Sequence, residues 1–205
     1  MDVYRSLGKA YPGGNPVNVS VYLKRLGEHA AYLGVVGDDE HGLLMKNSLA
    51  AKGVDISHLH SLTGKTAVTL VELVNGERVF VGYLEGVLAD FKLTQDDCDF
   101  LLRHDWIHSG IWGKIENELA GLHGLGPLIS FDFSDKYQHE IVTIALPHVD
   151  YAFFSYTKDD DFIRQFITTA QAVGPRLVIA TLGENGSLAY DGQRFYSGGI
   201  VPVQV

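Results

Sequence analysis

The spacing of apolar and polar residues along the chain alternates between two periods. Apolar residues at helical spacing predict helices over residues 16–26, 41–52, 94–103 and 160–173. Short apolar runs predict strands over residues 30–36, 106–108, 128–131, 151–154 and 177–181. Thr94 and Asp97 have the spacing of a capping box at the start of the third helix. Because strands that alternate with helices are typical of a largely parallel sheet covered by helices, we predict an α/β fold.

One stretch interrupts this alternation. Residues 66–74 and 78–84 are rich in β-forming residues, and Asn75-Gly76-Glu77 between them is a strong hairpin signal. A hairpin that stands apart from the main sheet is a common construction for a lid over a binding site. A second hairpin is predicted around Asp191-Gly192.

The composition narrows the class of protein. The chain has 205 residues, 46% of them apolar and 20% charged, which is ordinary for a globular protein. Its formal net charge of -9 argues against nucleic acid as the main partner, because an acidic surface repels phosphate backbones. No apolar run approaches the roughly 20 residues needed to span a membrane, so we expect no membrane partner.

Cys98 is the single cysteine, so no disulfide can form within the chain. This composition fits a reducing compartment, and we expect a cytoplasmic location. Acidic residues flank Cys98 and should raise the pKa of its thiol, which opposes reactivity.

The segment Pro12–Asn18 has the features of a ligand-binding helix start. Its glycines allow a ligand to approach the backbone, Asn15 is a good N-cap and Pro16 a good first helical residue. The amide of Asn18 would face the same cleft one turn later. The alternative is a tight turn before a well-capped helix, with no ligand.

Three further segments carry glycines or charges next to predicted strands. Val36–Gly42 is interpreted as a loop with an acidic helix start, which the helix dipole favours. Thr181–Gly186 follows an apolar strand, and its glycines create a turn where a nucleotide could pass close to the backbone or where the chain simply enters the next strand. Phe131–Lys136 ends in charged side chains that form either a site or a salt-bridged loop.

Several competing signatures fail. Gly64-Lys65-Thr66 matches the end of a P-loop, but that motif requires glycine where the chain has Leu59. There is no Gly-x-Gly-x-x-Gly after an early strand, no Gly-x-Ser-x-Gly and no His-Glu-x-x-His. His58 and His60 are better explained by a surface loop than by a metal site.

Taken in order, these motifs resemble those of the pfkB (ribokinase-like) family of carbohydrate kinases, over essentially the whole chain. Within that family the chain is most similar to the branch that phosphorylates fructoselysine. This similarity is carried by residues 9–15, 54–58, 85–91, 131–136 and 183–187.

The resemblance implies a ribokinase-like α/β fold, a doubly wound and mostly parallel sheet with a small β lid over the sugar. It implies a single kinase domain over residues 1–205 that is incomplete at both ends, with a lid formed by residues 5–12 and 66–88. Because the lids of two subunits pack together in many relatives, it also implies a homodimer through the lid.

The resemblance also assigns roles to individual residues. Asp2, Gly14 and Asn18 match positions that contact the sugar. We add the hypothesis that Glu85 meets the amino-acid part of an Amadori substrate.

Gly183 and Gly186 match positions on the nucleotide side, and Thr181 begins that turn, where we expect its hydroxyl to reach the phosphates. Relatives carry an Asn-x-x-Glu pattern tied to magnesium and phosphate, whereas this chain has Ser155 in place of the asparagine and its acid displaced to Asp159. Asp159 is therefore the candidate metal ligand, although its position differs from that of the acid in the family pattern.

The implied reaction is transfer of a phosphoryl group from ATP, with Mg²⁺, to a sugar hydroxyl. The acceptor is expected to be fructoselysine or a related fructosamine, at the 6-position. The family places its catalytic aspartate in a Gly-Ala-Gly-Asp motif, which is absent from the sequence, so we expect it beyond Val205. The alternatives are a kinase for another sugar or a nucleoside, and a sugar- or nucleotide-binding protein without catalysis.

Overall fold

The computed structural model of the chain describes residues 1–74 and 77–202. The chain divides into two compact units, Met1–Lys92 and Leu93–Val205, which are described here one at a time. Across the described residues, no helix is both long and apolar enough to cross a membrane.

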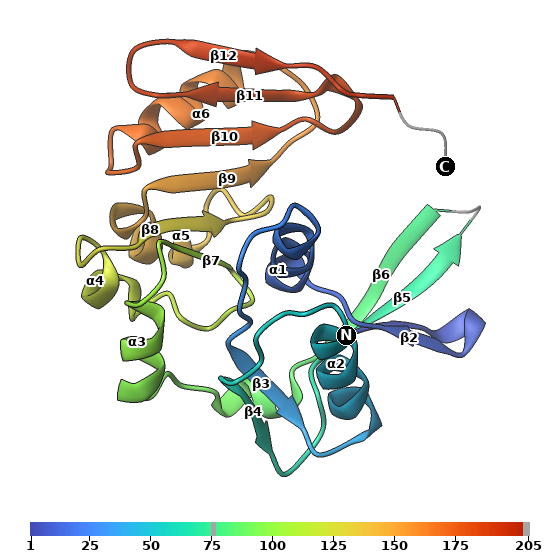
Figure 1. Cartoon of the computed structure of the whole chain (residues 1–205). Coiled ribbons are helices and arrows are strands. Elements are labelled where there is room, and N and C mark those ends of the chain that lie inside the picture. Colours follow the sequence, from blue (N-terminus) through green and yellow to red (C-terminus); the bar gives the residue numbers. More distant parts are fainter. Residues whose placement is uncertain (75–76, 203–205) are drawn as a thin grey trace. The chain divides into compact units, whose positions relative to one another are not determined.

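A four-stranded sheet in the first unit has the strand order β2-β1-β5-β6 (Figure 1). Its strands are β1 (Asp2–Tyr4), β2 (Lys9–Tyr11), β5 (Val68–Val74) and β6 (Glu77–Leu84). The 3₁₀ turn η1 (Arg5–Leu7) connects β1 to β2. β1 pairs with β2 in antiparallel and with β5 in parallel orientation. The segments expected to form a lid therefore belong to one sheet with the first strand.

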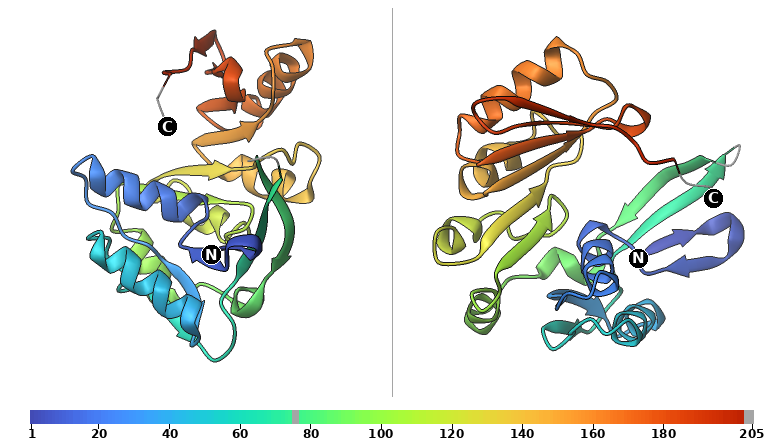
Figure 2. Two further views of the ribbon diagram at one scale, coloured as in Figure 1. Left: turned by 90° about the vertical axis from the view of Figure 1, so that its right-hand side faces the viewer. Right: turned by 45° about the horizontal axis from the view of Figure 1, so that its top comes forward.

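The predicted hairpin is confirmed by the antiparallel pairing of β5 with β6, which has a register shift between Leu70 and Val71. Its turn at Asn75-Gly76 lies outside the described residues. The views of Figure 2 show this hairpin extending away from the helices of the first unit.

The core of the first unit lies under two helices, α1 (Asn15–Arg25) and α2 (Glu40–Ala51), and a parallel strand pair, β3 (Gly34–Gly37) and β4 (Leu59–Leu62). A 3₁₀ turn, η2 (Gly86–Asp90), follows β6. The buried cluster that joins these elements to the sheet includes Val17, Val36, Met45, Leu49, Leu59 and Val68. Sequence reasoning missed β4, because its sequence LHSL is too short and polar to indicate a buried strand.

The second unit is built on a six-stranded sheet with the order β12-β11-β10-β9-β8-β7. The strands are β7 (Trp106–Gly110), β8 (Leu128–Asp132), β9 (Tyr151–Ser155), β10 (Leu177–Thr181), β11 (Ser187–Tyr190) and β12 (Phe195–Gly198). The first four run parallel, and β11 and β12 form the second predicted hairpin.

Short crossovers join the parallel strands of this sheet. They contain the helices α4 (Leu119–Leu122), α5 (Glu140–Ala145) and α6 (Asp161–Gln171) and the 3₁₀ turn η3 (Leu146–His148). The helix α3 (Gln95–Leu101) precedes β7, and the 3₁₀ turn η4 (Gly183–Asn185) follows β10. Because the strands follow in consecutive order and such crossovers are right-handed, the crossover helices lie on one face (Figure 1). Alternate residues Ile129 and Phe131 on β8 are fully buried, as is Ile163 on α6.

Helix starts are accurate to within a residue or two. Thr94 and Asp97 form the predicted capping box of α3. The prediction of Asn15 as the N-cap of α1 is wrong by one position, because the N-cap is Gly14, whose φ of 106° lies outside the helical region. The six-residue helix α5 was not predicted, since it is too short for a clear helical period.

A buried carboxylate joins three strands of the second unit where they begin. Asp150 is 4% exposed, and its Oδ2 accepts a 2.9 Å hydrogen bond from the N–H of Ile129. Its Oδ1 lies 2.8 Å from Nε of Arg176, and its carbonyl accepts from the N–H of Leu177. The loops at the carboxyl ends of these strands lie at the opposite edge of the sheet, which is where ligands of parallel sheets bind.

Candidate functional site

The Asp2 side chain lies directly against the backbone of Gly13. A Cβ atom added at Gly13 would overlap the Asp2 carboxylate, so the absence of a side chain at Gly13 makes room for it. Among the described residues, none donates a hydrogen bond to this carboxylate, and its oxygens remain open to hydroxyl donors.

Gly14 and Asn18 lie at the start of α1. The φ of 106° at Gly14 is a conformation that residues with side chains rarely adopt, and a Cβ there would meet only open space. The N–H of Asn18 donates to the carbonyl of Gly14 at 3.1 Å, and the Asn18 side chain is exposed. Asp2, through Gly13, therefore lies beside the turn that opens α1, which also carries Asn18.

Asp2 and Glu85 lie at the same end of the four-stranded sheet. The pairing register places Asp2 opposite Thr69 on β5, and Thr69 opposite Tyr83 on β6. Glu85 follows β6 by one residue, at the N-cap of η2. Burial is the main cause of the raised pKa of Tyr83, and the negative charge of Glu85 adds to it.

Thr181 ends β10 on the carboxyl edge of the second unit's sheet. Its hydroxyl donates to the carbonyl of Phe154 at 3.3 Å, and its carbonyl accepts from the N–H of Tyr156 at 2.8 Å. The Thr181 side chain therefore links β10 to β9, while the lone pairs of its oxygen remain available to a donor.

Gly183 and Gly186 shape the turn after β10. Both have positive φ angles, 59° and 84°. A Cβ at Gly183 would meet open space, whereas one at Gly186 would overlap the carbonyl of Gly198 on β12. The turn is closed by a 2.7 Å hydrogen bond from the N–H of Leu182 to the carbonyl of Gly186. Its outer side at Gly183 is thus the side open to a ligand.

Sequence reasoning missed the contribution of Asn185. Its Nδ2 donates to the carbonyl of Thr157 at 2.7 Å, which ties the turn after β10 to the segment after β9. Only the position of Asn185 between two glycines pointed to this loop.

Asp159, the metal-ligand candidate, is fully engaged by Arg164. The Nε and a terminal nitrogen of Arg164 donate to its two carboxylate oxygens, each at 2.6 Å. The same guanidinium lies 4.8 Å from the ring centre of Phe195. A metal ion at Asp159 would have to share a carboxylate that already accepts two hydrogen bonds from a guanidinium.

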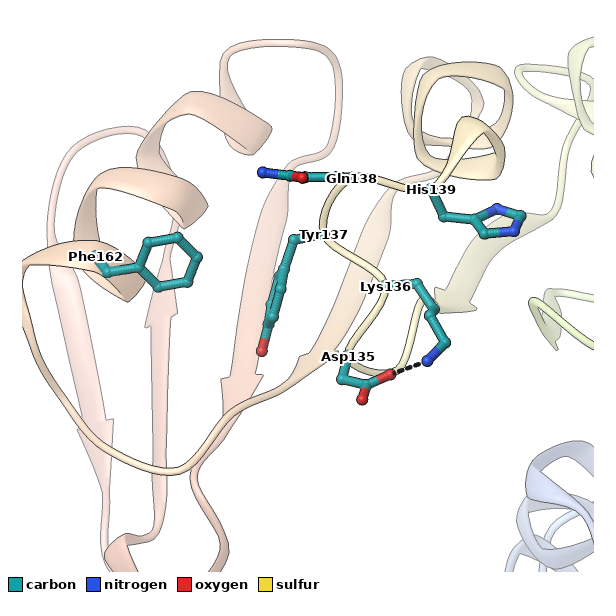
Figure 3. Close-up of a pocket in the computed structure, with 6 residues that line it drawn as sticks. All are labelled: Asp135, Lys136, Tyr137, Gln138, His139 and Phe162. Atoms are coloured by element: carbon teal, nitrogen blue, oxygen red, sulfur yellow. Dashed lines mark ion pairs between the residues drawn. The ribbon is translucent and has the colours of Figure 1, made fainter. Parts of the chain in front are cut away.

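A hollow of about 400 Å³ lies beside the motif that follows β8, lined by Asp135, Lys136, Tyr137, Gln138, His139 and Phe162 (Figure 3). The Lys136 ammonium lies 2.7 Å from the Asp135 carboxylate. This hydrogen bond is the main cause of the lowered pKa of Asp135. The motif thus contains the ion pair that a salt-bridged loop requires, and its interpretation as a site stays a prediction.

Aromatic packing positions the other side of this hollow. The Tyr137 ring packs edge to face against Phe162 and Phe166, with centroids 5.6 and 5.0 Å apart. Its hydroxyl donates to the carbonyl of Ser155. These contacts fix the loop after β8 against α6.

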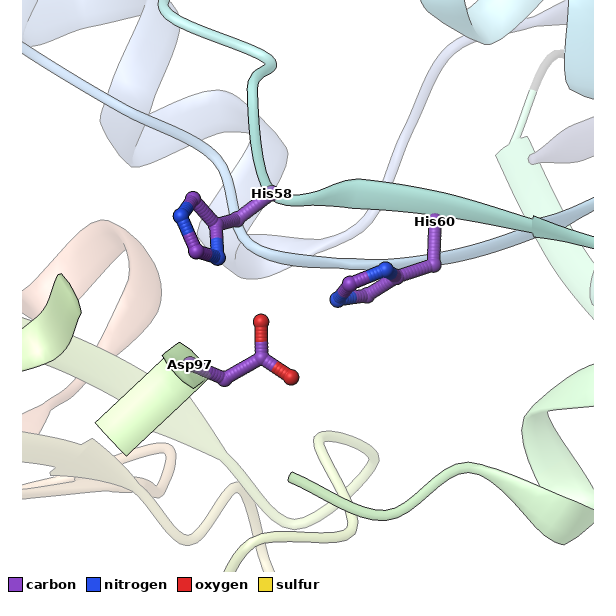
Figure 4. A group of neighbouring side chains, drawn as sticks. All are labelled: His58, His60 and Asp97. Carbon is purple, nitrogen blue, oxygen red and sulfur yellow. The ribbon is translucent and has the colours of Figure 1, made fainter. Parts of the chain in front are cut away.

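His58 and His60 stand on either side of Leu59 (Figure 4). Their rings meet edge to face with centroids 6.2 Å apart, and the His60 ring lies 6.4 Å from that of Phe91. Asp97, also drawn in Figure 4, belongs to the second unit, where it accepts hydrogen bonds from Thr94.

Cys98 has the raised thiol pKa that its acidic neighbours predicted. Burial is the largest cause, and the carboxylates of Glu118, Asp97 and Asp99 add to it. A thiol that resists ionisation is a poor nucleophile, so Cys98 is assigned no chemistry.

Comparison with known proteins gives this geometry a context. The model of the family described as pfkB family carbohydrate kinase matches residues 5–108. The chain is 45% identical over 205 residues to fructoselysine 6-kinase of Escherichia coli (strain K12), covering 100% of this chain and 78% of that protein. It is 32% identical over 210 residues to fructosamine kinase FrlD of Bacillus subtilis (strain 168), covering 100% of this chain and 74% of that protein.

Among solved structures, the chain is similar to a ribokinase of Arabidopsis thaliana complexed with ribose and ATP. The TM-score is 0.79 at 17% identity, over 92% of this chain and 67% of that one. At this identity the likeness establishes the fold, and it confirms the predicted ribokinase-like α/β class.

The contact between Asp2 and Gly13 can be tested by stability alone. Gly13→Ala should lower the free energy of unfolding by about 1–3 kcal/mol, because the new methyl group overlaps the Asp2 carboxylate. Urea unfolding of the full-length protein measures this. Gly121→Ala is the control, since its Cβ would meet open space on α4. Equal stability of the two variants would show that Asp2 moves aside freely.

Proposed function

This chain belongs to the pfkB family of carbohydrate kinases and is a phosphotransferase, and we propose that its acceptor is fructoselysine or a related fructosamine, phosphorylated at the 6-position. The observation that carries this proposal is the 45% identity over the whole chain to a fructoselysine 6-kinase. The similarity to a fructosamine kinase at 32% identity supports the same acceptor class.

In this proposal the first unit binds the sugar. Asp2 accepts hydrogen bonds from sugar hydroxyls, a role that suits a carboxylate because it can accept two donors at once. The backbone at Gly14 and the amide of Asn18 contribute from the start of α1. The support is the contact of Asp2 with Gly13, next to Gly14, which places a carboxylate without a donor beside this turn.

Glu85 is proposed to recognise what distinguishes a fructosamine from a plain sugar. The amine that links the sugar to the amino acid is basic, and a carboxylate forms a charge-assisted hydrogen bond with its protonated form. Glu85 is half-buried at the end of the sheet where Asp2 also lies, which supports this assignment.

The second unit is proposed to bind ATP through the turn after β10. Gly183 presents open backbone, and Gly186 holds the turn against β12. Thr181 contributes its hydroxyl oxygen. We further propose that the reaction uses Mg²⁺, which bridges and neutralises phosphate oxygens in phosphoryl transfer. The Asp159 carboxylate is a poor metal ligand as the structure holds it, because the charge of Arg164 already neutralises it through a hydrogen bond to each oxygen, and no metal ligand is assigned.

No Gly-x-Gly-Asp occurs among the 205 residues, so no residue of the chain is assigned the role of catalytic base. A cytoplasmic location is part of the proposal and is supported by the single cysteine.

A homodimer through the four-stranded sheet, acting as a lid, is also proposed. The support is the apolar character of the β5–β6 hairpin, whose exposed side chains are Leu73, Val74, Val79, Phe80, Val81, Tyr83 and Leu84. Exposed apolar surface of this extent is typical of an interaction site.

Acceptor profiling tests the proposed reaction. The full-length protein is expected to consume ATP with fructoselysine and related fructosamines at a kcat/KM at least about tenfold above that with fructose, ketodeoxy sugar acids or nucleosides. The measurement is coupled ADP release, with the phosphorylated position read by NMR. A preference for any other acceptor would reassign the substrate, and ATP consumption with none would overturn the proposal.

The role of Glu85 is tested by substitution. Glu85→Ala should raise the KM for fructoselysine about tenfold through loss of a charge-assisted hydrogen bond, with little effect on the KM for fructose. Glu72→Ala, on the same hairpin, is the control and should change neither KM. An equal change for both acceptors would eliminate amine recognition by Glu85.

The dimer is tested by placing a charge on the apolar hairpin. Phe80 is 67% exposed, and Phe80→Glu should raise the dimer dissociation constant at least about tenfold in sedimentation equilibrium. Leu125→Glu, at a residue 62% exposed in the second unit, is the control and should leave the constant unchanged. A monomeric wild-type protein, or identical behaviour of both variants, would rule this interface out.

A further inference from the structure

The motif Val36–Gly42 has no role in the proposed function, yet its hydrogen bonds extend far along the chain. Asp39 is the N-cap of α2, and its Oδ1 accepts from the N–H of Gly42 at 3.0 Å. The same carboxylate also accepts from Thr66, from its hydroxyl at 2.6 Å and its N–H at 3.2 Å. An ordinary helix cap requires only the first of these bonds, so the others call for a separate explanation.

Thr66 is held from two directions. Its hydroxyl donates to Asp39 and accepts from the N–H of Gly37 at 3.0 Å. Its side chain is buried, with 4% of the residue exposed. A neighbouring bond runs from the N–H of Gly64 to Oδ1 of Asp38 at 2.9 Å. The acidic pair of the motif thus fixes the segment of residues 64–66.

The charge state of Asp39 agrees with this arrangement. Burial alone would raise the pKa of the Asp39 carboxyl, but hydrogen bonds from Thr66 and Gly42 outweigh it and lower this pKa. The carboxylate that accepts these bonds is therefore ionised near neutral pH.

The glycines of the motif are also explained by its contact with the segment of residues 64–66. A Cβ at Gly37 would overlap the carbonyl of Gly64, and a Cβ at Gly42 would overlap the carbonyl of Gly37 and lie 3.0 Å from Oγ1 of Thr66. These glycines allow the segment of residues 64–66 to pack against the backbone of the motif.

On its other side, the segment of residues 64–66 contacts the turn after β6. The carbonyl of Lys65 accepts from the N–H of Val87 at 2.8 Å. A Cβ at Gly86, where φ is 53°, would overlap that same carbonyl. The segment is therefore packed between the motif and the turn that begins with Glu85.

Both ends of the β5–β6 hairpin meet at this point. Thr66 lies two positions before the first residue of β5, and Glu85 follows β6 directly. β5 also carries β1 in parallel register, with Asp2 opposite Thr69, and the N–H of Thr69 donates to the carbonyl of Met1 at 2.8 Å. The contact of Asp39 with Thr66 lies at the base of the strands that carry Asp2 and lead to Glu85.

We propose that Asp39 is a positioning residue that, through Thr66, fixes the base of the β5–β6 hairpin and so places the Asp2 and Glu85 carboxylates for the acceptor sugar. The kinetic part of this inference rests on the proposed function. Its structural part, the anchoring of the hairpin, does not.

The test compares Thr66→Val with two other variants of the full-length protein. Thr66→Val keeps the shape of the side chain and removes the hydroxyl, and Thr66→Ser restores the hydroxyl. Thr94→Val is the matched control, because Thr94 makes the equivalent pair of side-chain bonds with Asp97 at the start of α3. If Thr66→Val does not fold, Asp39→Asn replaces it, since it removes the acceptor for the Thr66 N–H and keeps the cap of α2.

Hydrogen exchange gives a readout that does not depend on activity. In Thr66→Val, the amides of residues 68–74 and 78–84 should exchange at least about tenfold faster than in the wild type, because local opening no longer has to break the two bonds of the Thr66 hydroxyl, to Asp39 and from Gly37. Thr66→Ser and Thr94→Val should match the wild type in these strands. Wild-type exchange in Thr66→Val would overturn the proposal.

Kinetics separate positioning from a general loss of stability. Thr66→Val should raise the KM for the acceptor about tenfold and leave the KM for ATP within about twofold, while Thr94→Val leaves both unchanged. Parallel changes in both KM values, or an unchanged acceptor KM, would overturn positioning. If the wild type phosphorylates no acceptor, the proposed function fails, and hydrogen exchange still decides the anchoring of the hairpin.

Discussion

Direct contact between backbone segments is the constraint on which the candidate sites depend. At Gly37, Gly42, Gly86 and Gly186, a Cβ atom would overlap a carbonyl group of another part of the chain. Side chains at these positions would push the segments apart and lengthen the hydrogen bonds between them. The loops are therefore held by main-chain packing, which tolerates less adjustment than contacts between flexible side chains. Three of these contacts lie in the first unit, and the contact at Gly186 lies in the second.

The regular elements of the fold were predictable because they depend on local pattern. The runs at residues 151–154 and 177–181 became β9 and β10, and the capping box at Thr94 formed as its spacing indicates. The elements that were missed, among them β4, α4 and α5, are short and receive their stability from tertiary packing, which leaves little trace in sequence. The family itself was predictable from the order of the motifs along the whole chain.

The site was less predictable than the fold, because its contacts join residues that are distant in sequence. The motif that contains Asp39 was interpreted as a loop with an acidic helix start, and α2 does begin there, but the bond of Asp39 to Thr66, 27 residues away, was not predicted. The fit of Asp2 against Gly13 likewise depends on strand pairing. Asp159 is a local case, because its partner Arg164 lies only five residues later, yet the spacing of the two residues alone did not reveal their ion pair. The roles of Asp2, Gly14, Asn18, Glu85, Thr181, Gly183 and Gly186 stay predictions.

The hairpin whose two ends meet beside Thr66 has a consequence for how such proteins diverge. Once its base is fixed, the entropy of closing the loop depends only on the logarithm of its length, and doubling the length costs about 0.6 kcal/mol. Insertions and deletions at the far end of β5 and β6 are then nearly neutral, whereas changes at the base are not. A hairpin that is free to vary in length is therefore attached directly to the residues proposed to choose the acceptor, so acceptor choice can change over evolution without reconstruction of the core.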